Sequence, residues 1–265
     1  MCGAPDNCAA QMSLTLTLSR QPARELEEGE LEEAVAEDPL RPVSSWAFMA
    51  RLRKAARVWG NPKAREIGER VLIKSDPHVF VIDLPVIFGR RAPVEIEIGA
   101  GKGEFIIERA AEFPERDFIA VELSGTITHV LAVRCGRAGL ENIRVARMDA
   151  RTLVNLMLPD ASVHAFHIYF PDPWPKERHV KHRLFTPTLV ASLFRTVEPG
   201  ATAYIATDVR DYSAEIFPMM LAAGFLRAVE AAPGAERTGF ARKYVAAGKP
   251  VYSAAFRKPR ESKST

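Results

Sequence analysis

Two acidic residues flank three spaced glycines in one short segment, residues 97–104 (EIGAGKGE). Three glycines, Gly99, Gly101 and Gly103, follow a β-forming run, as they do where a chain turns sharply and lets a ligand lie on its backbone. The start of the helix that follows would suit a phosphate, but Glu97 and Glu104 flank the turn and repel anions. The segment therefore predicts a site for a cationic ligand.

Two more acids follow the next two predicted strands. Glu122 lies about twenty residues after the turn, where an acid typically bonds ribose hydroxyls. Asp149 follows the next strand and is placed to accept from an adenine amino group. A ligand with a positive charge, a ribose and an adenine is expected, and together these features indicate S-adenosylmethionine. The dinucleotide fingerprint would need a glycine where Glu104 stands, which disfavours an NAD-dependent dehydrogenase.

Residues 170–183 (FPDPWPKERHVKHR) carry the most specific pattern in the chain. Two prolines stiffen the loop around Asp172, and Trp174 can stack on a base or simply pack the loop. A run of basic and titratable residues follows at once, as in surfaces that contact nucleic-acid phosphates: Lys176, Arg178, His179, Lys181, His182 and Arg183. The alternative for this run is a solvated basic loop.

Strands and helices alternate from residue 94 onward, and this alternation must position the site. We predict strands at 94–98, 118–123, 143–148, 162–170, 201–208, 225–230 and 251–257, and helices at 104–113, 128–139, 186–198 and 211–223. Gly139 is the expected C-cap of the second helix. Such βαβ units imply a mainly parallel sheet. No long helix is expected between the last two strands, so they should form an antiparallel edge.

The N-terminal part differs in charge from the rest. Residues 1–45 have a net charge of −6 and few large apolar residues, and we predict a disordered extension, followed by a domain over 46–265. A short amphipathic helix with a basic face is expected over 46–58, with Ser44 or Ser45 as its N-cap. The remaining chain carries +9, which fits either a polyanionic partner or a solvated tail on an ordinary domain.

Composition excludes several classes of protein. No apolar run approaches the roughly eighteen residues of a membrane span, and the N-terminus does not resemble a secretory signal. The cysteines Cys2, Cys8 and Cys135 are too few for a disulfide framework, and no Cys or His spacing suits zinc. We expect a cytoplasmic protein with no metal and no membrane partner, either a monomer or a homodimer.

These motifs together resemble the bacterial tRNA (guanine-N7-)-methyltransferases, a family of class I S-adenosylmethionine-dependent enzymes. The segment FPDPWPKERHVKHRLFTP is similar to the family signature, and EIGAGKGEF, AVEL, MDA and ATD fall in the family's order. The resemblance spans about residues 94–258. It implies a Rossmann-like α/β fold with helices on both faces of a seven-stranded sheet, in the order 3-2-1-4-5-7-6. It also implies methylation of the variable-loop guanosine at tRNA position 46.

The resemblance implies a role for several residues. The methyl donor would contact the glycine turn and the acids Glu97, Glu122, Asp149 and Asp172. The tRNA would contact Lys176, Asp208, Thr238 and Phe240, besides Trp174, Arg178, Lys181 and Arg183. Ala241 stands where the family's T-x-F-E motif has its acid.

Guanine N7 has a free lone pair, so the expected chemistry needs positioning rather than a general base. Asp172 is the predicted catalytic carboxylate, because it would stabilise the positive charge of the methylated ring. His164 and His167 alternate with apolar residues in one strand, which predicts a structural role for both. Two alternatives stay open: methylation of another RNA or protein nitrogen, and a noncatalytic tRNA-binding subunit of the same fold.

Overall fold

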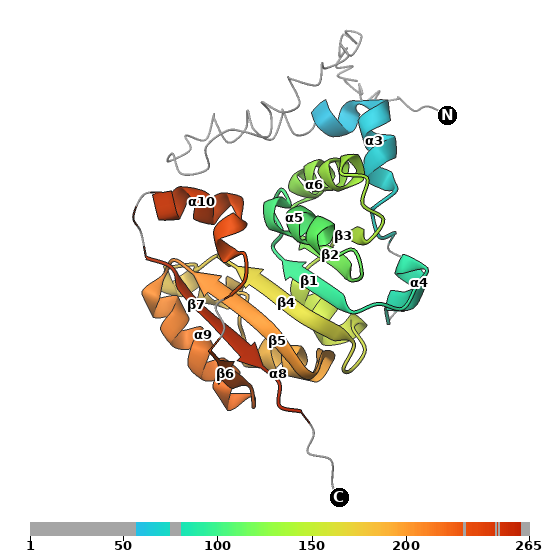
Figure 1. Ribbon diagram of the computed structural model, residues 1–265. Helices are drawn as coiled ribbons and strands as arrows, with labels where there is room; N and C mark the ends of the chain where they lie inside the picture. The colour runs from blue at the N-terminus through green and yellow to red at the C-terminus, as the bar shows by residue number, and fades with distance from the viewer. Residues whose placement is uncertain (1–56, 75–80, 230–231, 247, 249, 261–265) are drawn as a thin grey trace, which may run out of the picture.

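The computed structural model describes residues 57–74, 81–229, 232–246, 248 and 250–260. Its centre is a seven-stranded sheet in the order β3-β2-β1-β4-β5-β7-β6, as the resemblance implied (Figure 1). Strands β1 to β5 are parallel, and β7 runs antiparallel to both of its neighbours, β5 and β6. Their bounds are β1 Val94–Ile98, β2 Asp117–Glu122, β3 Ile143–Arg147, β4 Val163–Tyr169, β5 Val197–Thr207, β6 Leu226–Ala228 and β7 Tyr252–Arg257.

Helices cover both faces of the sheet. The described helices are α3 Pro62–Glu69, α4 Leu84–Phe88, α5 Glu104–Glu112, α6 Gly125–Arg137, α7 Ala150–Thr152, α8 Pro187–Thr196, α9 Arg210–Ala222 and α10 Gly239–Ala246. A π-helix, Leu153–Met157, follows α7, and 3-10 helices span Glu177–His182 and Ala235–Arg237. In the described part of the chain no helix is both long and apolar enough to span a bilayer.

Strand β2 shows how the sheet divides the core. Phe118 and Ala120 pack with α5 and α6 on one face, whereas Ile119 and Val121 belong to the cluster of α8 and α9 on the other (Figure 1). This alternation follows from the two-residue period of a strand. Both faces of β2 are therefore apolar, and the ends of the strands are where ligands bind in sheets of this kind.

The helix ends follow from local capping. The Ser124 side chain accepts from the Ile127 amide, so α6 begins before the predicted residue 128. Gly139 follows the helix end with a φ of +66°, the left-handed conformation expected of that glycine. The predicted extension over 1–45 and most of the predicted helix over 46–58 lie outside the described residues.

The C-terminal edge is antiparallel as predicted, but the chain between its strands is not simply a loop. Strand β7 inserts between β5 and β6, and the short helix α10 precedes it. Figure 1 places α10 over the carboxyl ends of the parallel strands. The segment before β7 therefore reaches the edge where the candidate site lies.

Helix α3 packs closely on α6 through a glycine. A Cβ added at Gly136 would lie 2.5 Å from the carbonyl oxygen of Ile67 and 2.7 Å from its Cγ2. Trp59 stacks on His129 beside this contact, with 4.1 Å between the ring centroids. Residue 136 must therefore stay without a side chain if α3 is to dock.

Replacement of this glycine should destabilise the protein. We expect Gly136→Ala to lower the free energy of unfolding by about 1–3 kcal/mol, because backbone must move although alanine favours a helix. Gly60→Ala is the matched control, since a Cβ there meets no atom within 4 Å. Urea unfolding measures both variants, and equal stability of the two would contradict the close approach.

Candidate functional site

The glycine turn after β1 has the conformation that its sequence predicts. Gly99, Gly101 and Gly103 have φ values of +77°, +56° and +80°. A Cβ at Gly103 would lie 2.5 Å from Leu131 Cδ1, whereas those at Gly99 and Gly101 would meet nothing within 4 Å. Gly103 is therefore closed in by packing, whereas Gly99 and Gly101 face open space, so a ligand can lie directly on the backbone of these two residues.

Glu97 is a buried carboxylate with one unsatisfied oxygen. Its side chain is buried on β1, and no other described residue gives Oε2 a hydrogen-bond partner. Burial raises the pKa of Glu97 well above its ordinary value, and the nearby Glu104 and Glu122 raise it further, while the Ile106 amide partly opposes them. A buried carboxylate with a free oxygen is suited to a cation.

Glu122 links the second strand to the glycine turn. Its Oε2 accepts from the Gly101 amide at 3.2 Å and its Oε1 from the Ser124 amide at 2.8 Å. Burial raises the pKa of Glu122, these amides lower it, and Asp172 adds a smaller upward contribution. Each oxygen retains acceptor capacity, so Glu122 can hold hydroxyl groups while it fixes the turn.

Asp149 follows the neighbouring strand β3 and is already paired within the chain. Its Oδ1 accepts from the Arg151 amide at 2.8 Å, and its Oδ2 lies 2.7 Å from Arg151 Nη2. The bond from the Arg151 side chain lowers the pKa of Asp149, so this group is a carboxylate. Oδ2 still has room for one further donor.

The loop after β4 is strained at both of its ends. Phe170 and Trp174 have φ values of +52° and +43°, and the described residues contain only one other non-glycine residue at positive φ, Ala161. Such strain persists only where surrounding structure enforces it, and it is concentrated at functional sites. The loop between them carries Asp172.

Asp208 lies at the same edge of the sheet as this loop. Tyr169 of β4 is opposite Ala206 of β5, and the Phe170 amide donates to the Ala206 carbonyl at 2.7 Å. Asp208 directly follows β5. The structure thus brings Asp172 and Asp208 to the ends of two neighbouring strands.

Arg183 has partners within the chain that sequence reasoning missed. Its side chain is only 15% exposed, and its Nε donates to the Pro173 carbonyl at 2.8 Å. Its Nη1 lies 2.5 Å from Glu215 Oε2. The arginine therefore braces the strained loop, and its contact with tRNA stays a prediction.

The other cationic side chains of residues 170–183 lie on the protein surface. Lys176, Arg178 and Lys181 are exposed on and beside the 3-10 helix Glu177–His182. The half-exposed Trp174 ring lies beside them, with its centroid 5.6 Å from that of His179 and 5.3 Å from that of His182. One surface thus carries an aromatic ring and several positive charges.

The C-terminal segment joins the same site. Thr238 Oγ1 accepts from the Ala241 amide at 3.1 Å, and the Phe240 ring packs on Phe170 with 4.9 Å between centroids. Ala241 is buried, but a carboxylate lies close by: a Cβ at Gly239 would be 3.2 Å from Glu104 Oε1. No local sequence signal predicts the Phe170–Phe240 contact.

Comparison with known proteins agrees with this arrangement. The family described as "Putative methyltransferase" matches residues 91–254. A Burkholderia cenocepacia protein named tRNA (guanine-N(7)-)-methyltransferase is 36% identical over 234 residues, 86% of this chain and 91% of its own length. The chain belongs to the bacterial tRNA (guanine-N7-)-methyltransferase family.

Other members of the tRNA (guanine-N7-)-methyltransferase family match over a shorter stretch. A Nitrosomonas eutropha protein of the same name is 45% identical over 132 residues, so the match covers 50% of this chain and 59% of that relative. Among solved structures, a 16S rRNA methyltransferase matches with a TM-score of 0.49 and 16% identity, over 64% of this chain and 90% of that one.

Two glutamates of β1 should have opposite effects on stability. We expect Glu97→Gln to raise the free energy of unfolding by about 1–3 kcal/mol near neutral pH, because it removes a buried acid that must take up a proton when the chain folds. Glu95, two residues earlier, is paired with Arg109 and Arg116. We expect Glu95→Gln to lower the free energy of unfolding by about 3–5 kcal/mol.

The two effects should also differ in their pH dependence. The pKa of Glu97 in the folded protein is above its unfolded value near 4.5. Glu97 therefore destabilises the protein increasingly as the pH rises from the unfolded to the folded pKa. The folded pKa of Glu95 is below that value, so its contribution is present at neutral pH and lost in acid. Urea unfolding across pH measures this, and a Glu97→Gln variant less stable than wild type at alkaline pH would contradict it.

Proposed function

We propose that this protein transfers a methyl group from S-adenosylmethionine to N7 of guanine in tRNA, at the variable-loop guanosine of tRNA position 46. One observation carries the proposal: an acid-lined glycine turn lies at the same sheet edge as a strained Asp-containing loop with exposed cations. The printed name of the curated relatives, tRNA (guanine-N(7)-)-methyltransferase, supports the same reaction.

The residues present fit a cationic nucleoside. Glu97 offers a buried oxygen without a partner, and the backbone at Gly99 and Gly101 faces open space. Glu122 and Asp149 would hold the ribose hydroxyls and the adenine amino group. When bound, S-adenosylmethionine supplies an electrophilic methyl group on a positively charged sulfur.

The protein's own contribution to the reaction is position and charge. Guanine N7 carries a lone pair at neutral pH, so no side chain has to remove a proton. Asp172 and Asp208 follow neighbouring strands and would stabilise the positive charge that the ring gains. Because Arg183 bonds the Pro173 carbonyl, the Asp172 loop is held before substrate arrives, which reduces the reorganisation needed.

The same loop would bind the tRNA. Lys176, Arg178 and Lys181 would neutralise backbone phosphates, and the Trp174 ring would stack on a base or support the loop. Only exposed cations are assigned to this contact, since they can reach phosphates without breaking a bond inside the protein. We infer a cytoplasmic enzyme acting on tRNA, and the reaction itself needs no metal.

Nucleoside analysis tests the reaction and the role of Asp172 together. We expect the protein to form N7-methylguanosine in an unmodified tRNA transcript, and Asp172→Asn to lower kcat/KM by about 100-fold, as the loss of one preorganised charge contact does. Digestion of the transcript and mass spectrometry of its nucleosides measure both.

A matched aspartate provides the control. Asp160 precedes β4 at the opposite end of the sheet, is 75% exposed and pairs with Arg195. We expect Asp160→Asn to keep kcat/KM within about twofold of wild type, because exposed ion pairs contribute little. A different methylated nucleoside would contradict the proposed substrate atom, and full activity of Asp172→Asn would contradict its role.

A further inference from the structure

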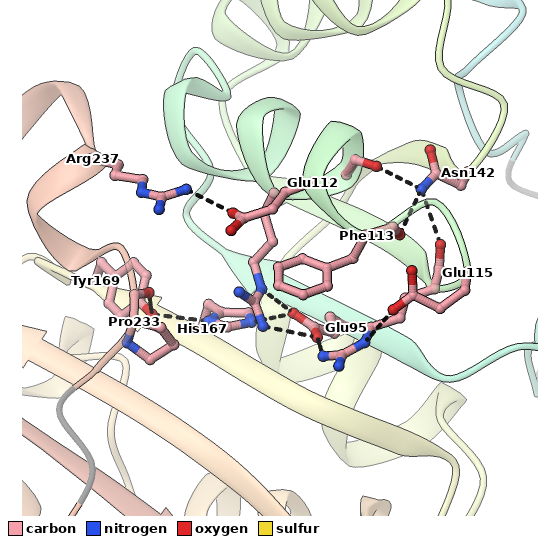
Figure 2. Close-up of polar contacts among 12 residues, drawn as sticks. Glu95, Glu112, Phe113, Glu115, Asn142, His167, Tyr169, Pro233 and Arg237 are labelled. Carbon is pink, nitrogen blue, oxygen red and sulfur yellow. Dashed lines mark hydrogen bonds and ion pairs between the residues drawn. The ribbon is translucent and has the colours of Figure 1, made fainter.

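A buried polar network lies beneath the strained loop and takes no direct part in the proposed reaction. Figure 2 shows Glu95 of β1 facing His167 of β4, with Tyr169 on the far side of the histidine. Glu95 Oε2 lies 2.8 Å from His167 Nε2, and His167 Nδ1 lies 2.9 Å from the Tyr169 hydroxyl. Glu95 and His167 are fully buried.

Tyr169 joins this network to the C-terminal segment. Its hydroxyl donates to the Pro233 carbonyl at 2.9 Å (Figure 2). Tyr169 is the residue before the strained Phe170, and Pro233 lies five residues before Thr238. One hydroxyl therefore ties the start of the Asp172 loop to the base of the segment that carries Thr238 and Phe240.

Among the described residues, two ion pairs also attach this segment to α5. Arg237 pairs with Glu112 at 2.8 Å, and Arg242 pairs with Glu108, but all four side chains are at least 41% exposed. Exposed pairs of this kind stabilise little. The buried bond from Tyr169 is thus the polar contact best placed to hold the segment.

The protons of the network allow two arrangements. Glu95 accepts from Arg109 at 2.5 Å and from Arg116 at 2.6 Å, so it is a carboxylate and must accept from His167 Nε2. If His167 is neutral, its Nδ1 has no proton and competes with the Pro233 carbonyl for the single hydroxyl proton of Tyr169. If His167 is charged, Nδ1 donates to Tyr169 and the hydroxyl proton is left for Pro233.

Groups from several elements face His167. Glu95 of β1 favours its charged form, while Arg109 of α5 and Arg116 before β2 oppose it. Phe105 of α5 and Tyr204 of β5 pack on its ring, with centroids 4.8 Å and 5.3 Å away, and Tyr169 bonds its other nitrogen. Burial is the largest influence and holds the pKa of His167 below its ordinary value.

We propose that Tyr169 is a positioning residue that docks residues 232–241 against the 170–174 loop, and that protonation of His167 strengthens this docking. The proposal deepens the proposed function, on which it rests for the identity of the substrate. The docking itself concerns only this chain and can be measured without substrate.

Hydrogen exchange of the free protein tests the docking. Tyr169→Phe keeps the ring that packs edge-on against Phe105 but removes the hydroxyl. We expect amides of residues 237–242 to exchange about fivefold to tenfold faster in this variant, the effect of losing one buried hydrogen bond. The matched control is Tyr204→Phe, because the Tyr204 hydroxyl makes no hydrogen bond within the described part of the chain. Equal exchange in the two variants would overturn the proposal.

Kinetics on tRNA distinguish positioning from a general loss of structure. We expect Tyr169→Phe to raise KM for tRNA about fivefold with a smaller change in kcat, and thermal unfolding to stay close to that of Tyr204→Phe. The ratio of wild-type to Tyr169→Phe kcat/KM should rise as the pH falls from about 8 to about 5, because only wild type has the bond that His167 controls and the pKa of His167 is below its ordinary value.

Using the ratio of wild-type to Tyr169→Phe kcat/KM removes the contribution of the other titrating groups, which both proteins share. His179 and His182 lie near the substrate loop in both proteins, so their titration cancels. A ratio that does not change with pH would overturn the role of His167. Faster exchange in Tyr169→Phe together with no methyl transfer by wild type would refute the proposed reaction and leave the docking standing.

Discussion

Two buried glutamates lie two residues apart on β1, and only the first of them is paired with positively charged side chains. Glu95 has two arginines and a histidine, whereas Glu97 has an oxygen without a partner. A buried unpartnered carboxylate is costly in free energy, and that cost is offset when the group takes up a proton or when a positive group binds beside it. The glycine turn, whose backbone is open on the same side, gives such a ligand a place to lie.

The other segments of the site are positioned around this buried carboxylate and its glycine turn by side-chain contacts. Glu122 bonds the glycine turn, Arg183 braces the Asp172 loop, and Tyr169 ties that loop to the C-terminal segment. Each contact holds a loop or turn in place through a side chain from another part of the chain. Sites built this way keep their geometry before the ligand arrives, which is the main requirement of a reaction that needs alignment and no proton removal.

Most of the sheet and the geometry of the glycine turn could be predicted from sequence, because both depend on local patterns. The run VEIEI gives β1, the spaced glycines give a turn at positive φ, and Glu122 and Asp149 follow strands whose ends meet at one edge. Contacts between distant residues have no such signal. Arg183 resembled a phosphate ligand by composition, but its carbonyl partner at Pro173 appears only once the loop is folded. The contacts of Phe240 with Phe170 and of Tyr169 with Pro233 depend likewise on where α10 docks.

Proton release on ligand binding tests most directly whether Glu97 is held for a cation. Calorimetric titration of S-adenosylmethionine in buffers of different ionisation enthalpy counts the protons exchanged. Because burial raises the pKa of Glu97 and a bound cation would lower it, wild type should release up to about one proton per ligand between those two pKa values. Glu97→Gln should bind more weakly and release none. Equal affinity and equal proton release in the two proteins would contradict this account.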